Sequence, residues 1–326
     1  MMDTTEREIF TAGLRRAAEE STAGSLDDAL EAMGWADAFA ADRHIAVSAL
    51  FEAQGGAGAT STALAKVLQA GLGLDLADGT AFVLPPPGSA AVPAHVGTTD
   101  GHGPCVLLHG IGLCDLPRVS RAVVVAERDR TLWSAVVETS ELAARMVDGI
   151  DPTMGLSELE THCVPALEGW SPVEGSWDDA VAVGRLAIAH ELVGAMRTML
   201  ALAREHALDR IQFGRPISEF QAVRHRLAES LVAVEAAEGA LVGAWSDGTP
   251  FTAMLAKAVA GNSARTVRRH CQQVMAGIGF TTEHDLHRYI RRTMVLDALL
   301  GDAHSLTEEI GRRLLAERRI PHLLPL

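Results

Sequence analysis

Residues 209–228 read DRIQFGRPISEFQAVRHRLA, and this stretch decides how the second half of the chain folds. Its Phe-Gly pair marks a short turn, and a helical pattern opens again at Phe220. The stretch therefore predicts a loop between two long helices. Arg210 and Phe213 stand in that loop, where an arginine can hold a diphosphate bidentately while the neighbouring ring packs on a flat base.

Long helical segments flank this loop on both sides. Upstream, apolar residues from Leu186 to Ala203 mark one wide helix face. Downstream, the same period predicts helices at 219–241, 251–275 and 284–300, with a shorter one after them. Gly277-Ile278-Gly279 closes the third of these four helices in the manner of a C-cap. Four long helices with short connections indicate a C-terminal helical bundle, which we place at 179–326.

The first half of the chain has two regions with different residue patterns. Residues 1–75 alternate loops with helical stretches at 6–20, 26–33, 44–52 and 61–70. Residues 76–178 carry a linker or turn of three prolines, several glycines, and short β-branched runs at 105–108, 122–125 and 133–137. The predicted fold is therefore mainly α, with an N-terminal helical domain at 1–75 and a small middle β domain at 76–178.

Composition and charge exclude several classes of protein. The chain has 326 residues, of which 48% are hydrophobic and 21% charged, as in a globular protein. Its formal charge of -14 argues against nucleic acid or an anionic membrane as the main partner, although Arg265, Arg268 and Arg269 form a local basic run. No apolar run approaches the roughly 20 residues that cross a bilayer. Four cysteines in no CxxC pair favour a cytoplasmic protein with reduced thiols.

Two further motifs have an ordinary structural interpretation. The run Gly55-Gly56-Ala57-Gly58-Ala59-Thr60 resembles a phosphate-binding loop, but it lacks the Gly-Lys-Ser/Thr ending and follows no strand, which favours a turn between helices. Potential metal ligands occur in the middle region without a second pair at zinc spacing: His102, Cys105, His109, His162 and Cys163. We therefore predict no metal site.

The loop and the end of the third bundle helix together resemble a known family. Residues 209–228 and 273–288, the latter reading QVMAGIGFTTEHDLHR, are similar to the C-terminal helical domain of the acyl-CoA dehydrogenases. The similarity extends upstream through Gly184-Arg185 to Gly194, and Gln54–Gly58 resembles the family's Gly-rich inter-helix turn. The resemblance implies a helical domain, a small β domain and a four-helix bundle, with FAD held where subunits meet.

The resemblance also implies a reaction and a set of binding residues. Members of the family oxidise an acyl-CoA thioester to the 2-enoyl-CoA: a carboxylate removes the α-proton while the β-hydrogen leaves as hydride to flavin N5. By position, the resemblance assigns Arg210 to the FAD diphosphate, Phe213 to the adenine side, and Gln212 to the cofactor-binding residues. The resemblance also implies contacts with the cofactor of a neighbouring subunit by three residues, Gln221, Gln273 and Gly277.

The chain departs from the family where the catalytic base is expected. Most members have the catalytic Glu after the fourth bundle helix, just before a Gly, and Leu300 stands at that position here. A minority have it at the start of the first bundle helix, just before an Arg, and Gly184 stands at that position. The middle region contains no Thr-Glu-Pro-Gly-like segment of the kind that faces the flavin ring. No residue is assigned as the base; Glu191, Asp302 and His304 are the nearest alternatives.

A chain that keeps the diphosphate loop but lacks the base resembles the short subunit of the heteromeric acyl-CoA dehydrogenases of actinobacterial steroid catabolism. That resemblance implies an α2β2 heterotetramer, a homologous partner chain that supplies the catalytic Glu, and a steroid-derived acyl-CoA substrate. Two alternatives remain open at this point. The first is a homomeric dehydrogenase with an unassigned base, and the second is a flavin-free scaffold or acyl-CoA-binding protein.

Overall fold

The structure is a computed structural model that describes residues 4–21, 26–75, 80–99, 103–114, 116–165 and 169–318. It has two compact units. The helical unit comprises Met1–Ala59, Arg185–Asp297 and Ala303–Leu326, and the β unit comprises Thr60–Gly184 and Ala298–Asp302. The predicted fold class, mainly α with a small β domain, is confirmed. The three domain boundaries remain a prediction.

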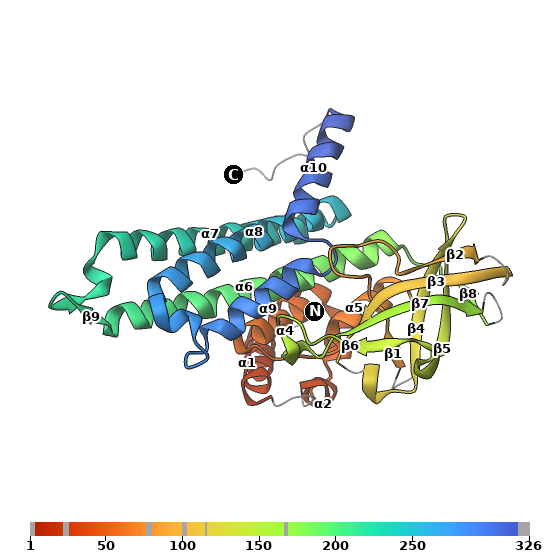
Figure 1. The fold of residues 1–326 in the computed structure, drawn as a ribbon, viewed down its shortest axis with the longest axis horizontal. Helices are drawn as coiled ribbons and strands as arrows, with labels where there is room; N and C mark the ends of the chain where they lie inside the picture. Colours follow the sequence, from red (N-terminus) through yellow and green to blue (C-terminus); the bar gives the residue numbers. More distant parts are fainter. Residues whose placement is uncertain are drawn as a thin grey trace. The chain divides into compact units, whose positions relative to one another are not determined.

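Most helices belong to the helical unit. Its N-terminal helices are α1 (Thr4–Glu20), α2 (Leu26–Ala32), α3 (Trp35–Ala41) and α4 (Arg43–Ala57). Its C-terminal helices are α7 (Gln221–Asp247), α8 (Pro250–Met275), α9 (Leu286–Ala298) and α10 (Ala303–Glu317), joined to the β unit by α6 (Trp177–Asp209). Helices α7 and α8 lie side by side along their length (Figure 1). The predicted bundle helices correspond to α6 to α10, whereas α3 was not predicted.

Helices α4 and α6 cross at glycines, which lets the two backbones touch. A Cβ atom added to Gly55 would lie 2.0 Å from the Glu191 carbonyl oxygen, and one added to Gly194 would lie 2.1 Å from the Glu52 carbonyl oxygen. The predicted turn at 55–60 is therefore in part the last turn of α4, which Gly58 caps with φ of 66°. Gly55 and Gly194 are required by packing between helices.

This crossing gives the first prediction. Gly194→Ala should lower the free energy of unfolding by about 1–3 kcal/mol or more, because the clash is with backbone and only a movement of α4 relieves it. Gly311→Ala in α10 is the matched control, since a Cβ there meets nothing within 4 Å. The control should stabilise by up to ~1 kcal/mol through helix propensity. Urea unfolding of both variants measures the difference, and equal midpoints would contradict a tight crossing.

The β unit is built on an eight-stranded sheet with the order β6-β7-β3-β2-β4-β5-β8, in which β1 also pairs with β4. Its strands are β1 (Thr80–Phe82), β2 (Ala94–Thr99), β3 (Gly103–Gly112), β4 (Arg121–Arg128), β5 (Thr131–Glu138), β6 (Ala144–Met146), β7 (Ser157–Pro165) and β8 (Ser171–Pro172). The three predicted β-branched runs lie in β3, β4 and β5. β4 is buried from Ala122 to Ala126, which explains its uninterrupted apolar run. Helix α5 (Ala63–Gly71) precedes the sheet.

The corner between α9 and α10 packs within the β unit. Its residues are Ala298–Asp302, and the Gly88 N–H donates to the Ala298 carbonyl oxygen at 2.7 Å. Gly88 comes directly after the three prolines, so the predicted linker or turn ends at a contact with this corner. The corner carries two positive φ angles, 55° at Leu300 and 95° at Gly301.

Helix α6 is the most apolar long helix in the described part of the chain. By length and hydropathy alone it could cross a membrane, but 72% of its most apolar 18-residue window is buried inside the protein. Its apolar face is therefore part of the core of the fold.

Candidate functional site

The loop that the sequence singles out is a small hairpin. Strands β9 (Ile211–Gln212) and β10 (Arg215–Pro216) pair antiparallel, and the Gln212 Nε2 donates to the Ile211 carbonyl oxygen at 2.8 Å. The two residues of its turn, Phe213 and Gly214, have φ angles of 53° and 79°. Two positive φ angles are typical of a type I′ turn, where asparagine or glycine is usual and phenylalanine is strained.

The turn presents an aromatic ring to solvent. Phe213 is 91% exposed and meets Phe220 edge-on, with ring centroids 6.0 Å apart. The Arg215 guanidinium stacks over Phe220 at 4.5 Å from the ring centroid. A large apolar side chain held outward in a strained turn is a feature of binding surfaces rather than of folding.

Beside the hairpin, the helical unit has a pocket of about 430 Å³. The end of α6, the hairpin and the end of α8 each contribute to its wall: His206, Arg210, Gln212, Ile217 and residues 274–278. Val274 and Met275 are buried and form an apolar floor. The structure thus brings together three of the predicted binding residues, Arg210, Gln212 and Gly277.

Two features make the pocket suitable for an anion next to an apolar surface. The Arg210 guanidinium makes no ion pair with any residue that the structure describes. A Cβ atom added to Gly277 would meet nothing within 4 Å, so the pocket is open at this backbone position. Its neighbour Ala276 has φ of 51° and ψ of −132°, a conformation rare outside glycine that is found mainly at ligand-binding and active sites.

The other predicted binding residues lie outside this pocket. Gln221 is the first residue of α7, Gln273 lies near the end of α8, and both are exposed. Neither lines the pocket. Conversely, sequence reasoning missed His206, which lines it. The signal was its place in the sequence, since His206 stands four residues before Arg210, where the upstream helix gives way to the predicted loop.

The two positions at which the resemblance places a catalytic base touch each other within the β unit. Leu300 is 2% exposed, and a Cβ atom added to Gly184 would lie 2.6 Å from the Leu300 Cδ1. The next nearest atoms to that Cβ belong to Leu68. Leucine side chains therefore fill the space at both positions, and neither position offers a carboxylate.

Among the alternative bases, Glu191 is part of a buried ion pair in the helical unit. The Arg292 Nε donates to the Glu191 Oε1 at 2.9 Å, and the Gln54 Nε2 donates to its Oε2 at 2.9 Å. Glu191 and Arg292 are 3% and 2% exposed. The Arg292 Nη2 also donates to the Ala59 carbonyl oxygen. Both carboxylate oxygens of Glu191 are thus occupied by protein donors.

The other two alternative bases, His304 and Asp302, stand at the start of α10 and in the corner before it. His304 is exposed, and its Nε2 pairs with the Glu308 Oε1 at 3.2 Å. Asp302 is half-buried in the corner between α9 and α10.

The potential metal ligand His102 lies outside the described residues, as do the side chains of Cys105, His162 and Cys163. No group of three or more metal-ligating side chains occurs among the residues that the structure does describe.

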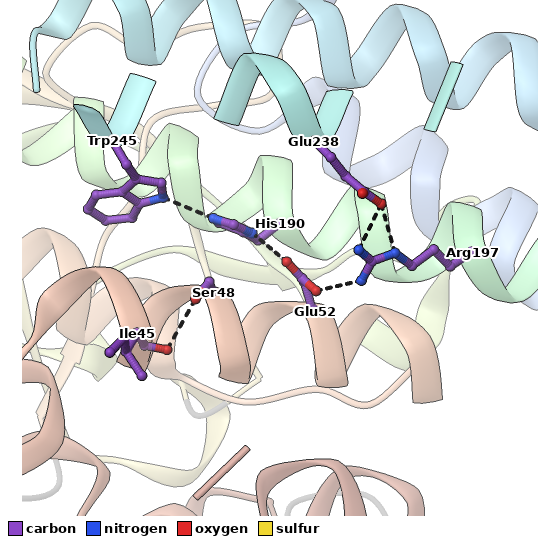
Figure 2. A network of polar contacts seen from close by, with 7 residues as sticks. All are labelled: Ile45, Ser48, Glu52, His190, Arg197, Glu238 and Trp245. Carbon is purple, nitrogen blue, oxygen red and sulfur yellow. Dashed lines mark hydrogen bonds and ion pairs between the residues drawn. The ribbon is translucent and has the colours of Figure 1, made fainter. Parts of the chain in front are cut away.

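A polar network joins α4, α6 and α7 (Figure 2). The Trp245 Nε1 donates to the His190 Nε2 at 2.9 Å, and the His190 Nδ1 lies 2.9 Å from the Glu52 Oε1. An indole N–H only donates, so Nε2 accepts and Nδ1 carries the proton that is donated to Glu52. The Arg197 side chain bridges the Glu52 Oε2 and the Glu238 Oε1. The network ties three helices together.

The network predicts an acid-dependent loss of stability. Burial alone would raise the pKa of Glu52, but the hydrogen bond from His190 and the charge of Arg197 lower it below its usual value. A carboxylate with a lowered pKa contributes stability above its unfolded pKa and loses it as the pH falls through the folded pKa. Between about pH 5 and pH 3, Glu52→Gln should therefore lose less unfolding free energy than the wild type.

Thermal melts across this pH range test the contribution of Glu52. The control is Glu8→Gln, an exposed carboxylate of α1, which should follow the wild-type curve. If the curves of Glu52→Gln and the wild type stay parallel down to about pH 3, the network does not contribute in this way.

Comparisons with known proteins agree with this architecture. The family model "Acyl-CoA dehydrogenase, C-terminal domain" matches residues 177–315. Acyl-CoA dehydrogenase IpdE2 of Mycobacterium tuberculosis is 34% identical over 178 residues, which are 55% of this chain and 52% of that relative. The chain thus matches about half the length of this relative.

Two solved structures share the fold over nearly the whole chain. A variant of the Tcur3481-Tcur3483 steroid ACAD has a TM-score of 0.73 at 24% identity and covers 96% of both chains. The ChsE4-ChsE5 complex from Mycobacterium tuberculosis has a TM-score of 0.74 at 20% identity and covers 98% of this chain and 99% of that one. At these identities the likeness concerns the fold.

Proposed function

We propose that this chain, a member of the acyl-CoA dehydrogenase family, is one subunit of an FAD-dependent acyl-CoA dehydrogenase. Its catalytic carboxylate would come from a homologous partner chain. The observation that carries the proposal is the contact between Leu300 and Gly184. Both positions for a base are apolar and filled, while the pocket beside the hairpin keeps an arginine without an ion pair among the described residues.

The pocket fits the diphosphate part of FAD. Arg210 would bind the diphosphate through charge-assisted hydrogen bonds, with the Gln212 amide as an additional donor. Val274 and Met275 would exclude water from the inner wall. The exposed Phe213 ring would pack on the adenine. Gln221 and Gln273, which lie outside the pocket, would contact the cofactor of a neighbouring subunit. Gly277 lines the pocket and would leave room there for the cofactor bound by Arg210 or for that of the neighbouring subunit.

The chemistry divides between the two chains. When bound, FAD is the hydride acceptor of the reaction. Removal of the substrate's α-proton needs a base within hydrogen-bond reach, and leucine at position 300 cannot accept a proton. The chain would therefore bind the cofactor, and the partner would supply the carboxylate. The product is a 2,3-unsaturated CoA thioester.

The relatives support a proposal for the substrate class and for the assembly. Two of the solved structures with this fold are named as a steroid ACAD and as a complex of two chains. We propose a steroid-derived CoA thioester as substrate and an α2β2 heterotetramer as assembly, in the cytoplasm. A homomeric enzyme that uses Glu191 is disfavoured, because the Arg292 and Gln54 side chains hold both oxygens of that carboxylate.

The test is the visible spectrum and native mass of the chain, alone and co-expressed with a homologous chain encoded beside it. Flavin absorption and a heteromeric mass should appear together in the co-expressed sample. A homo-oligomer of this chain alone that carries flavin and turns over substrate would contradict the split site. A complex that never carries flavin would support the flavin-free scaffold instead.

Arg210→Ala tests the pocket within that complex. Losing a charged hydrogen-bond donor, worth about 1.5–3 kcal/mol, should weaken FAD binding about 10- to 100-fold and bleach the purified complex. Arg16→Ala, an exposed arginine of α1, is the matched control and should keep the flavin. If both variants retain equal flavin, Arg210 does not hold the cofactor.

A further inference from the structure

His206 is half-buried and lines the pocket together with Arg210. It belongs to the last turn of α6, and the Arg210 N–H donates to the His206 carbonyl oxygen at 2.9 Å. Arg210 directly follows the last residue of α6 and keeps this helical hydrogen bond, and both residues line the pocket. An anion bound in this pocket by Arg210 would therefore also face the His206 imidazole.

The groups around His206 favour its neutral form before a ligand binds. Burial lowers the pKa of His206 below its usual value, and His284 and Arg210 lower it further, while Asp209 opposes them. The other residues in the pocket wall carry no charge. The Leu286 N–H donates to the His284 Nδ1 at 3.1 Å, so that Nδ1 accepts and His284 has its Nε2 left for a proton. In the free protein the pocket wall therefore holds one permanent cation, Arg210.

We propose that His206 is a second phosphate-binding side chain of this pocket and takes up one proton from solvent when a diphosphate ligand binds beside Arg210. The inference rests on the proposed FAD pocket and adds a residue and a proton to it. The geometry that carries it is the shared pocket wall and the four-residue spacing.

The physical reason is electrostatic. A diphosphate brings negative charge into a half-buried pocket, and an opposite charge within about 4–6 Å favours the protonated imidazole. Protonated His206 and Arg210 together would match the charge of the ligand. Linkage then requires the affinity to rise as the pH falls, by up to about tenfold per pH unit between the pKa values of the free and bound states.

The experiment titrates FAD into the flavin-free protein, as the full chain with its co-expressed partner, by calorimetry at about pH 7. Two buffers that differ in ionisation enthalpy give the number of protons taken up. The wild type should take up more protons than His206→Gln, and its affinity should fall more steeply between about pH 6 and pH 8. His206→Gln keeps a hydrogen-bond donor of similar size, and circular dichroism confirms that it is folded.

Two further variants separate the outcomes. His304→Gln, an exposed imidazole of α10, should behave as the wild type. His284→Gln should retain the proton uptake, and its loss there would assign the proton to His284 and overturn the proposal. Equal proton uptake and affinity in the wild type and His206→Gln would overturn it while leaving the FAD pocket intact. Failure of FAD to bind the wild type at all would overturn both proposals.

Discussion

Glu191→Ala should lower the free energy of unfolding by about 3–5 kcal/mol, because it leaves the Arg292 guanidinium buried without its counter-charge. The Gln54 amide loses its acceptor in the same step. Denaturant unfolding of the full chain measures the effect. Glu308→Ala removes an exposed partner of His304 and should change stability by less than about 1 kcal/mol.

A double variant refines this result. Replacing Glu191 by leucine together with Arg292 by methionine removes both charges, and such apolar replacements of buried pairs are often neutral or stabilising. It should therefore recover most of the loss. If Glu191→Ala kept full stability but lowered the rate of dehydrogenation 10²–10⁴-fold, Glu191 would be the base of a homomeric enzyme instead.

The chain purified alone should turn over its CoA thioester about 10²–10⁴-fold more slowly than the complex with its partner, since general-base catalysis contributes about that much. Reduction of an artificial electron acceptor, measured per flavin, compares the two samples. Normalising to flavin separates a missing base from a missing cofactor.

The control for the partner-supplied base is a complex in which the partner's proposed catalytic Glu is replaced by Gln. It should keep its flavin and its mass while falling to the rate of the isolated chain. Equal rates per flavin in the isolated chain and the complex would mean that this chain contains its own base.

Local patterns were sufficient for much of the fold. The apolar period predicted the bundle helices, and the Phe-Gly pair predicted the turn at 213–214. Helix α3 was missed because no Ser, Thr, Asp or Asn stands before it as an N-cap; the residue at that position is Gly34, which makes no side-chain cap. Its three buried residues, Trp35, Ala38 and Phe39, are spaced at i, i+3 and i+4, so the helix has an apolar face of about one turn.

The binding residues were predictable one segment at a time. Arg210, Gln212 and Gly277 were named from the motifs in which each stands, without any indication that they share a pocket. The approach of Gly277 and His206 to Arg210 depends on how α6 and α8 end in space, which no local pattern records. Likewise, the sequence located Leu300 and Gly184 separately, but their contact is a property of the folded β unit.

The crossing of α4 and α6 has a consequence for the evolution of this chain. Gly55 and Gly194 each lie against the backbone of the other helix, so selection for folding acts on both positions whatever the substrate. An alignment of orthologues should show glycine retained at both, even in lineages whose pocket residues have diverged. Where one glycine is lost, a change in the facing helix should accompany it. These two positions would then trace the ancestry of the scaffold independently of its chemistry.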